Sequence, residues 1–434
     1  MKPIKVGLLG IGTVGGGTAA VLKRNAAEIT RRAGCHIELI EVATRTISRA
    51  EGVVDAGVKV SADLESVVNN PDVDIVVELI GGTGLAKDLM LKAIENGKHV
   101  VTANKALIAT CGNEIFARAR EKNVMIAFEG AVAGGVPIIK AIREALSANR
   151  IEWAAGIING TSNFILTEMR EKGASFADVL KEAQRLGYAE ADPTFDIEGN
   201  DAAHKLTIIA ALAFGIPFQY DKAYIEGIST LDAADIKYAE ELGYRIKLLG
   251  ITRRAPNGIE LRVHPTLIPE KRLIANVNGV MNAVLVKGDA VGSTMYYGPG
   301  AGAEPTASAV VADIVDVARL LTADPQHRVP LSAFQPDMLS SDPILPIDEV
   351  VSSYYLRMQV TDQAGVMAEI TGILAENNIS IEALLQKEAH GGTAEIVILS
   401  HLAVEKQVNA AIKRIEGLAA SRGKVVKLRM ETLG

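Results

Sequence analysis

Cysteine is scarce in this sequence, and neither a dense basic run nor a long uninterrupted apolar run occurs. The two cysteines, Cys35 and Cys111, form no CxxC pair or metal-binding spacing, which fits a reducing compartment and two small buried side chains. The formal charge of −7, without a block rich in Lys and Arg, argues against a nucleic-acid surface. We therefore expect small-molecule partners, and neither nucleic acid nor membrane.

No signal for export or membrane insertion is apparent. The first residues, MKPIKVGLLGIG, enter a strand pattern without the apolar stretch and cleavage site of a signal peptide. The longest apolar run, 206–218, is too short to span a bilayer. A chain of 434 residues, 48% hydrophobic and 22% charged, instead predicts a soluble, cytoplasmic protein of two or three domains.

A glycine-rich turn follows the first predicted strand, at 4–9. In this GIGTVG motif, Gly10 permits the tight turn, Gly12 lets backbone approach a pyrophosphate, and Gly15 allows close packing of a helix on the strand. Thr13 and Val14 lie between them, where the helix N-terminus offers N–H groups to phosphate. A bare GxGxxG is a weak signal, but its place between strand and helix predicts a dinucleotide site.

The patterns that follow alternate regularly between strand and helix. Strands are expected at 37–43, 75–79 and 100–102, and helices at 64–68 and 85–96. Such alternation predicts a parallel, doubly wound sheet of the Rossmann type.

Basic residues lie where this sheet would bind its cofactor. The second strand ends near Arg45, at a position where NAD enzymes usually carry an acidic residue for the ribose. Arg45, with Lys59 nearby, instead suits the 2′-phosphate of NADP, with a solvated loop arginine as the alternative. Gly81 and Lys105 follow later strands at the same carboxyl edge, so Lys105 is either an ordinary surface lysine or a cation beside the nicotinamide.

The most acidic stretch, 186–205, leads into a helix. Asp201 and Lys205 stand four residues apart, on one face of that helix. Such ion pairs are usually solvated surface features. However, Lys205 begins an apolar helix, 205–214, where an unpaired lysine would be costly. The Asp201–Lys205 pair is therefore a candidate reacting centre.

Three further segments carry groups suited to ligands. Glu129, in the glycine-rich segment 129–137, offers a carboxylate and bent backbone that suit a hard cation, although a plain tight loop is the simpler interpretation. The segment 159–163, NGTSN, is either a helix-capping cluster or a site for a small zwitterion. Small residues around Gly302 let backbone approach a ligand.

The C-terminal region follows a proline-rich connector. Strand and helix patterns between 354 and 430 have the order βαββαβ, the ferredoxin-like arrangement. We thus expect an α/β chain of three domains and a linker. They are a Rossmann domain at 1–135 completed by a helix at 300–322, a central α+β substrate and dimerisation domain at 136–320, a linker at 321–349, and a regulatory domain at 350–434.

Four motifs closely resemble homoserine dehydrogenases of the longer, single-function bacterial type, over essentially the whole chain. They are GxGxxG at 10–15, VVTANKAL at 100–107, NGTSNFIL at 159–166 and GYAEADPTFDIEGNDAAHK at 187–205. The later VTDQAGVMAEITGIL resembles an ACT domain, an amino-acid-sensing module. Ala364 replaces the proline usual before Gly365, which affects little beyond turn rigidity.

The resemblance implies reversible NAD(P)-dependent interconversion of L-homoserine and L-aspartate 4-semialdehyde, in threonine, methionine and isoleucine biosynthesis. It implies that Lys205 exchanges the proton at the substrate oxygen, with Lys105 close to both ligands and Asp201 orienting the reacting groups. Glu190 would bind the substrate amino group, and Gly302 matches a cofactor contact. The other substrate positions that it implies are Gly160, Thr161 and Asp196.

The resemblance also implies a sodium site, formed by Glu129 and the carbonyls of Val132, Gly134 and Val136. It implies a homodimer or homotetramer and feedback by threonine through the ACT domain. Two alternatives remain open: another NAD(P)-linked enzyme acting on an amino-acid-derived carbonyl, and a catalytically silent threonine sensor. The sequence does not decide between NAD and NADP.

Overall fold

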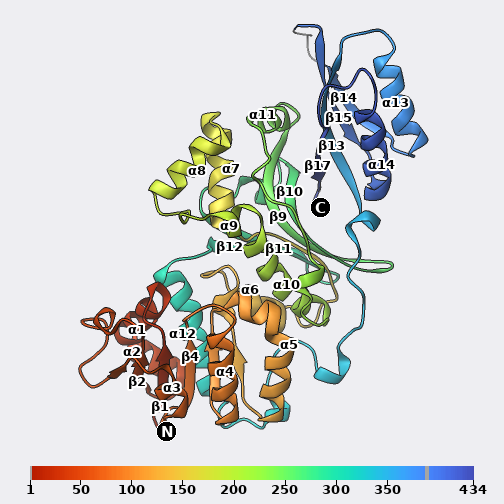
Figure 1. Cartoon of the computed structure of the whole chain (residues 1–434). Helices are drawn as coiled ribbons and strands as arrows, with labels where there is room; N and C mark the ends of the chain where they lie inside the picture. Colours follow the sequence, from red (N-terminus) through yellow and green to blue (C-terminus); the bar gives the residue numbers. More distant parts are fainter. Residues whose placement is uncertain (1, 387–390) are drawn as a thin grey trace.

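The protein, as a computed structural model, is described for residues 2–386 and 391–434. Three parts follow one another along the molecule: an N-terminal sheet covered by helices, a central sheet, and a C-terminal sheet with two helices (Figure 1). The helix α12 (Ala303–Leu320) comes late in the sequence but lies within the N-terminal part. The chain therefore crosses twice between the first two parts.

The N-terminal part is a six-stranded parallel sheet in the order β3-β2-β1-β4-β5-β6. Its strands are β1 (Ile4–Leu9), β2 (Ile37–Ala43), β3 (Lys59–Ser61), β4 (Ile75–Glu78), β5 (His99–Thr102) and β6 (Ile126–Ala127). Its helices are α1 (Thr13–Arg24), α2 (Ala26–Ala33), α3 (Leu64–Asn69), α4 (Leu85–Glu95) and α5 (Lys105–Glu121). This strand order confirms the predicted doubly wound fold, in which ligands bind at the carboxyl ends of the strands.

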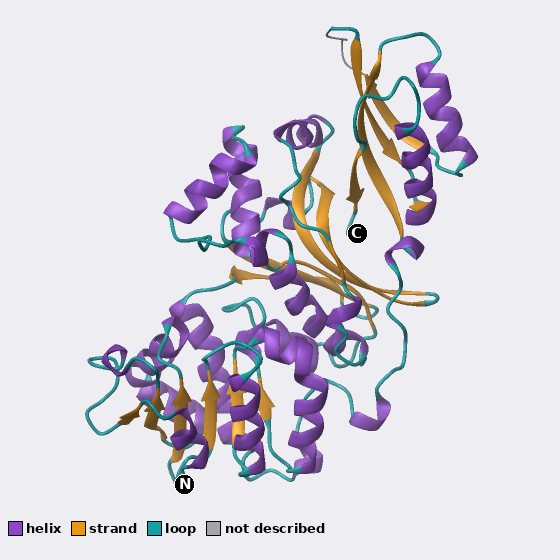
Figure 2. Cartoon of the chain, in the orientation of Figure 1, coloured by secondary structure: helices purple, strands orange, loops and turns teal. Residues whose placement is uncertain are grey.

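Helices cover both faces of this sheet (Figure 2). Buried residues of α1, α2 and α12 share one hydrophobic cluster with Val6, Leu8 and Val77 of the strands. Residues of α4 and α5 pack in the cluster on the other face, with Val76 and Val100. The alternate residues of β4 thus face opposite layers, as a sheet buried on both sides requires.

The central part is built on a sheet in the order β12-β11-β7-β9-β10. Its strands are β7 (Ile151–Ile157), β8 (Tyr224–Ile225), β9 (Tyr244–Ala255), β10 (Gly258–Pro269), β11 (Met281–Gly288) and β12 (Gly292–Pro299). Its helices are α6 (Ile138–Lys140), α7 (Gly160–Lys172), α8 (Phe176–Arg185), α9 (Thr194–Ile197), α10 (Asn200–Phe214) and α11 (Ala233–Glu241). The apolar helix α10 is buried along its whole length from Asp201 onwards.

The C-terminal part has the predicted ferredoxin-like order, β17-β13-β15-β14, with a short β16. Its elements are β13 (Val351–Thr361), α13 (Val366–Glu376), β14 (Ile381–Gln386), β15 (Thr393–Ser400), β16 (Ala403–Val404), α14 (Glu405–Glu416) and β17 (Val426–Met430). β17 also pairs in parallel with β10, where Thr266 lies opposite Arg429 and Leu267 opposite Met430. The central and C-terminal sheets are therefore one continuous sheet.

Buried charges hold this junction together. Arg429, which is 0% exposed, donates to Glu405 at 2.6 Å and to Glu226 of the central part at 2.8 Å. Arg262 of β10 pairs with Glu260 at 2.9 Å and with Glu431 at 2.5 Å. Each cation has carboxylate partners, which is the condition for burying a charge at tolerable cost.

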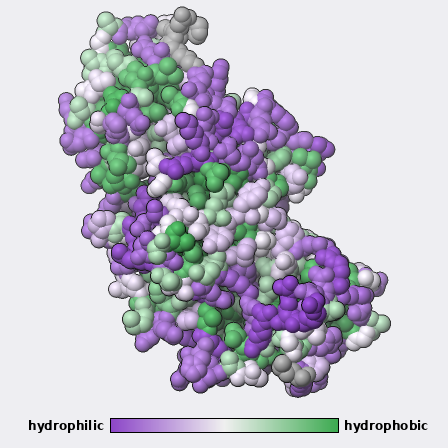
Figure 3. Space-filling model, turned by 180° about the vertical axis from the view of Figure 1, so that it is seen from behind, coloured by the Kyte–Doolittle hydropathy of each residue, from purple (hydrophilic) through white to green (hydrophobic). Residues whose placement is uncertain are grey.

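The surface is mixed in character. Figure 3 shows hydrophobic side chains, in green, exposed among hydrophilic ones in the middle of the rear face. Leu273 and Tyr297 of the central part are 76% and 58% exposed. Within residues 2–386 and 391–434, none of the helices combines the length and apolar character that a membrane crossing needs.

Candidate active site

A cavity of about 450 Å³ opens between the N-terminal and central parts. Its size suits a small substrate together with a cofactor ring. Its lining comes from the start of α5, the start of α7, the acidic stretch with α10, the strand β11 and the loop before α12. The lining residues are Lys105, Asn159, Gly160, Thr161, Gly187, Tyr188, Asp196, Asp201, Lys205, Val280, Asn282, Pro299, Gly300, Ala301 and Gly302.

Lys205 and Asp201 form the buried ion pair that the spacing allowed. The pair lies on the first turns of α10, which Gly199 begins in the left-handed conformation. Lys205 Nζ donates to Asp201 Oδ2 and to the carbonyl of Ile158, both at 2.7 Å. The side chains are only 11% and 6% exposed, so the pair is not a solvated surface feature.

Lys105 reaches the same carboxylate from the N-terminal part. It is the first residue of α5, directly after β5, and its Nζ lies 3.1 Å from Asp201 Oδ1. Asn104 caps this helix, accepting from Leu107 N, and its amide donates to the carbonyl of Gly82 at 2.7 Å. The two oxygens of Asp201 therefore face one lysine from each part of the molecule.

A buried carboxylate, Glu78, fixes the strand ends that carry Lys105. It accepts from Thr102 Oγ1 at 2.7 Å and from the backbone N–H groups of Ile80 and Gly81 at 2.9 and 3.0 Å. The left-handed Gly81 lies in the loop that this carboxylate holds. Glu78 thus ties β4 to β5 at the cofactor edge of the sheet.

Asn159 joins the acidic residues of the pocket. Its Nδ2 donates to Asp196 Oδ1 at 2.7 Å and to Asp201 Oδ2 at 2.8 Å, while its Oδ1 caps α7 by accepting from Ser162 N. Thr161 Oγ1 donates to the Tyr188 carbonyl at 2.6 Å and lies 3.3 Å from Asp196 Oδ2. The NGTSN segment is therefore a helix cap and also part of the pocket.

Burial and mutual charge shift the pKa values of these groups. Burial lowers the pKa of Lys205, against the opposing attraction of Asp201. Burial alone would raise the pKa of Asp201, but the cations of Lys205 and Lys105 outweigh it and hold that pKa below its usual range. Burial, followed by repulsion from Asp201, raises the pKa of Asp196. A lysine that releases its proton more easily than usual suits proton transfer at an oxygen.

The glycine turn has the geometry that a pyrophosphate needs. Gly10 has a φ of 94°, and a Cβ on Gly15 would lie 2.1 Å from the carbonyl oxygen of Gly10, so a side chain has no room there. A Cβ on Gly12 would meet nothing within 4 Å, which leaves open space beside the start of α1. Thr13 and Val14 are the first residues of this helix, whose N-terminal N–H groups have no side-chain cap.

The two basic candidates for NADP differ in their surroundings. Arg45 is exposed just beyond β2. Lys59 Nζ pairs at 2.7 Å with Glu41, a fully buried carboxylate that also accepts from Ser66 and Asn70. Lys59 is thus already paired with a carboxylate of the protein, although 62% of its side chain is exposed to solvent.

The glycine-rich segment after β6 is held in place by hydrogen bonds within the protein. Both oxygens of buried Glu129 accept backbone N–H groups, from Ile139 at 2.9 Å and Lys140 at 2.8 Å. Ala133 and Gly134 have positive φ, and Val132 and Val136 are buried. Among the residues described, no group of three or more His, Cys, Asp or Glu side chains could hold a metal. A cation there would rely on one carboxylate and backbone carbonyls.

Glu190 and Gly302 lie at the margins of the pocket. Glu190 is exposed and does not line the cavity, although its neighbours Gly187 and Tyr188 do. Gly302, with a φ of 123°, begins α12 at the rim. The bridging role of Asn159 and the presence of Asn282 in the wall were not predicted, because neither residue carries a sequence signal beyond a helix cap or a strand position.

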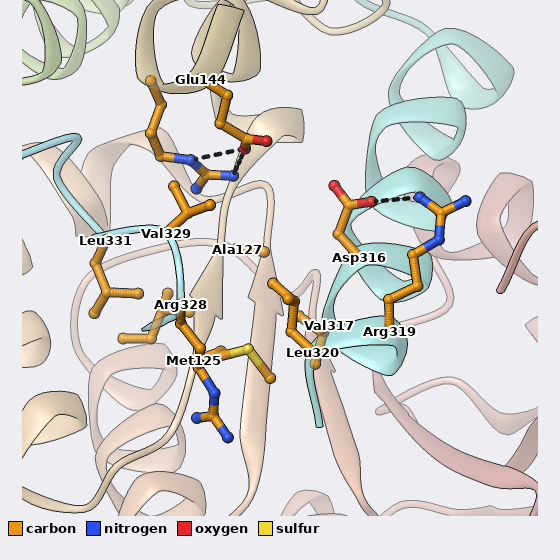
Figure 4. Close-up of a pocket in the computed structure, with 12 residues that line it drawn as sticks. Met125, Ala127, Glu144, Asp316, Val317, Arg319, Leu320, Arg328, Val329 and Leu331 are labelled. Atoms are coloured by element: carbon orange, nitrogen blue, oxygen red, sulfur yellow. Dashed lines mark hydrogen bonds and ion pairs between the residues drawn. The ribbon is translucent and has the colours of Figure 1, made fainter. Parts of the chain in front are cut away.

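A second cavity lies beside β6, near the end of α12, away from these residues (Figure 4). Arg143 and Arg319 line it, but each pairs with a carboxylate, Glu144 at 2.7 Å and Asp316 at 3.2 Å. Its floor is apolar, with Met125, Ala127, Val317, Leu320, Val329 and Leu331. The candidate catalytic side chains lie in the first cavity.

The dinucleotide fold and the lysine-lined pocket beside it together define a nicotinamide-dependent oxidoreductase. Family models describe the same organisation: a homoserine dehydrogenase NAD-binding domain matches residues 10–129, a homoserine dehydrogenase domain matches 137–315, and an ACT domain matches 354–420. The chain belongs to the homoserine dehydrogenase family, and it is an NAD(P)-dependent oxidoreductase acting on a CH–OH group.

Two relatives match this chain along its whole length, and a third matches about three quarters of it. A homoserine dehydrogenase of Pseudomonas aeruginosa is 64% identical, with 100% of both chains covered. The crystal structure of a homoserine dehydrogenase from Thiobacillus denitrificans is 66% identical, covers 100% of this chain and 99% of that one, and superposes with a TM-score of 0.96. A hyperthermophilic archaeal homoserine dehydrogenase in complex with NADPH, 26% identical, covers 73% of this chain and 98% of its own, with a TM-score of 0.63.

Proposed function

We propose that the protein interconverts L-homoserine and L-aspartate 4-semialdehyde, with Lys205 exchanging the proton at the substrate oxygen. The observation that supports this most is the convergence of Lys205 and Lys105 on Asp201 inside the cavity, at 2.7 and 3.1 Å. The pathways served are those of threonine, methionine and isoleucine, in the cytoplasm. The alternative of a silent sensor is disfavoured by this intact lysine–carboxylate centre.

The nicotinamide cofactor, when bound, supplies or accepts the hydride at the carbon. As the aldehyde is reduced, negative charge develops on its oxygen, and cationic Lys205 stabilises that charge and gives the proton. In the opposite direction Lys205 must be neutral to accept the proton, which its lowered pKa favours. Asp201 holds both lysine side chains in place, and Lys105 lies where it assists with charge at the reacting oxygen.

The acidic wall of the cavity suits the ammonium group of an amino acid. Asp196, Thr161 and Gly160 line it, and we assign to them contacts with the substrate. Glu190 is assigned the amino group by resemblance, which requires the 187–193 loop to close inward, since Glu190 is exposed here.

For the cofactor, the pyrophosphate is assigned to Gly10, Gly12, Thr13, Val14 and Gly15. Arg45 is an exposed basic side chain suited to a 2′-phosphate, and an NADPH complex of a related enzyme supports NADP as one cofactor. Lys59 would have to contact the 2′-phosphate while it remains paired with Glu41. Gly81, Lys105 and Gly302 lie around the expected nicotinamide end.

Three further assignments rest mainly on resemblance. Sodium would bind at Glu129 with the carbonyls of Val132, Gly134 and Val136. Threonine would act through the ACT domain. A homodimer or homotetramer would cover exposed apolar side chains such as Leu273 and Tyr297; sedimentation of the purified protein measures this state.

The test follows NADPH absorbance with aspartate 4-semialdehyde, and identifies homoserine as the product. Lys205→Ala should lower turnover about 10²- to 10⁴-fold, the usual contribution of general acid–base catalysis, and leave cofactor affinity largely unchanged. Lys181→Ala, an exposed lysine on α8, is the matched control and should behave as wild type. Unchanged turnover in Lys205→Ala would remove Lys205 from the mechanism.

A further inference from the structure

The wall of the active-site cavity contains one buried amide without a partner. Asn282 lies on β11 opposite Gly298 of β12, and it is 1% exposed. Both polar atoms of its side chain, Oδ1 and Nδ2, have no hydrogen-bond partner among the described residues. Leaving a buried amide unpaired costs stability, so such a group usually has a ligand or an ordered water as its partner.

The loop that covers Asn282 is shaped to lie directly on it. A Cβ on Gly300 would lie 1.9 Å from Asn282 Oδ1 and 2.1 Å from its Cγ, so only glycine fits there. Gly300 therefore touches the amide without bonding to it. Pro299, Ala301 and Gly302, on either side, are exposed lining residues of the cavity. Pro299 is held by its pairing with Met281 and by the N–H of Gly135, which donates to its carbonyl at 3.0 Å, so a shift of residues 300–302 would open the amide to the cavity.

The position of Asn282 favours the cofactor over the substrate. The charged lining residues lie on α5, α9 and α10, whereas Asn282 shares its wall with the 299–302 segment; they are Lys105, Asp196, Asp201 and Lys205. That segment leads directly into α12, which packs on α1: a Cβ on Gly17 would lie 2.5 Å from the carbonyl oxygen of Ala303. The uncharged side of the cavity, formed by Asn282 and residues 299–302, is thus continuous with α12 and α1, the helices beside the glycine turn.

The chemistry of the amide points the same way. A primary amide presents a donor and an acceptor side by side, and its complement is another primary amide. The substrate offers an ammonium, a carboxylate and a single oxygen at the reacting carbon, whereas the nicotinamide ring carries a carboxamide.

We propose that Asn282 binds the carboxamide of the nicotinamide ring when the 300–302 segment moves off it, and so fixes which face of the ring meets the substrate. The proposal rests on the placement of the cofactor given above. It makes Asn282 a cofactor-binding residue that acts on the nicotinamide end alone.

Calorimetric binding of two ligands tests this: the oxidised cofactor, and its 3-acetylpyridine analogue, in which a methyl group replaces the amide NH₂. Wild type should bind the cofactor about tenfold more tightly than the analogue, the effect of losing one hydrogen bond to a buried acceptor. In Asn282→Ala that ratio should fall to about twofold or less. An unchanged ratio in the variant would overturn the proposal.

Two controls separate this effect from damage to the fold. ADP-ribose, which lacks the nicotinamide, should bind equally to wild type and Asn282→Ala; an equal loss of its affinity would also count against the proposal. Asn149 packs on Gly288 at the other end of the β11–β12 hairpin, but its Oδ1 accepts from Val291 N at 2.9 Å. Asn149→Ala should lower thermal stability and preserve the binding ratio.

The unliganded protein gives a further readout. Because the amide has no partner, Asn282→Ala should leave the melting temperature unchanged or raise it, while the rise caused by saturating cofactor becomes smaller. A lower melting temperature with a normal rise on cofactor binding would assign Asn282 a purely structural role. Failure of wild type to bind either dinucleotide would instead refute the cofactor placement.

Discussion

Lys205 donates to the carboxylate of Asp201, one helical turn earlier, and both side chains are almost completely enclosed. Burial lowers the pKa of Lys205, and the negative charge of Asp201 raises it again. In the proposed mechanism homoserine oxidation requires the neutral amine of Lys205, so its rate should increase with pH until the pKa of Lys205 is passed, below the usual lysine value. The reduction rate should decline over the same range.

Asp201→Asn should move this profile toward acid. Without the carboxylate, nothing offsets the burial of Lys205 as strongly, so its pKa falls further and the neutral amine forms at lower pH. Turnover should drop as well, because both lysines lose their anchor. The measurement is kcat for oxidation between pH 6 and 10, in wild type and variant; an alkaline displacement, or a flat profile in wild type, would contradict this role for Lys205.

Asn159→Ser separates the two tasks of Asn159. Serine keeps an oxygen able to cap α7 but lacks the Nδ2 group that bridges Asp196 and Asp201. We expect a small change in melting temperature and a KM for homoserine raised about tenfold, since losing a hydrogen bond to a charged group costs about 1.5 kcal/mol or more. Asn276→Ala is the control, because the Asn276 amide donates to the carbonyls of Glu270 and Arg272, away from the pocket. A wild-type KM in Asn159→Ser would show that the bridge is dispensable.

Arg45→Ala and Lys59→Ala should have different consequences. Arg45 is exposed, so its loss should weaken NADP about tenfold, in line with about 1.5 kcal/mol for a charged hydrogen bond, and leave NAD and stability unaffected. Lys59→Ala should also lower thermal stability, because it removes the cation paired with buried Glu41. Initial rates with both cofactors and a melting curve measure these effects. Equal losses with NAD and NADP in Arg45→Ala would exclude a contact with the 2′-phosphate.

Glu431→Gln should destabilise the junction of the two sheets. It leaves Arg262, which is 1% exposed, with one carboxylate fewer, and breaking a buried pair costs about 3 kcal/mol. Burial opposes the charge of Glu431, but Arg262 and Arg253 outweigh it and lower its pKa. The stabilising effect is thus present above the ordinary glutamate pKa and is lost as pH falls through the lowered one. Melting curves of wild type and variant should therefore converge below about pH 4, whereas Glu152→Gln, at an exposed position on β7, should match wild type throughout.

Local patterns predicted four of the six strands of the N-terminal sheet, because a glycine turn and alternating apolar segments are determined by nearby residues; the short strands β3 and β6 were not predicted. The ferredoxin-like order was predicted for the same reason. The sequence did not predict that β10 continues into β17. Arg262 and Lys247 look unsuited to a buried strand, and their burial depends on partners far along the chain, such as Glu431, 169 residues after Arg262, and Asn163, 84 residues before Lys247.

The same difference between local and long-range contacts applies to the candidate active site. The spacing of Asp201 and Lys205 predicted their contact, since one helix carries both. Long-range packing was needed to bring Lys105 to Asp201, and to place Asn159 between two carboxylates. Lys59 was predicted from its charge alone, and only the fold shows the buried Glu41 beneath it. No local pattern distinguishes Asn282, whose unusual state depends on Gly300, eighteen positions later.

The pairing of β17 with β10 also bears on synthesis of the chain. Residues 426–430 emerge from the ribosome after the other strands of the described residues, so until then Thr266 and Leu267 of β10 lack the strand that pairs with them, and Arg262, which lies beside β8, lacks Glu431. Open strand edges invite pairing with other chains. A nascent chain stalled before this point would therefore expose a strand edge that is prone to aggregation. Pairing with β17 covers that edge.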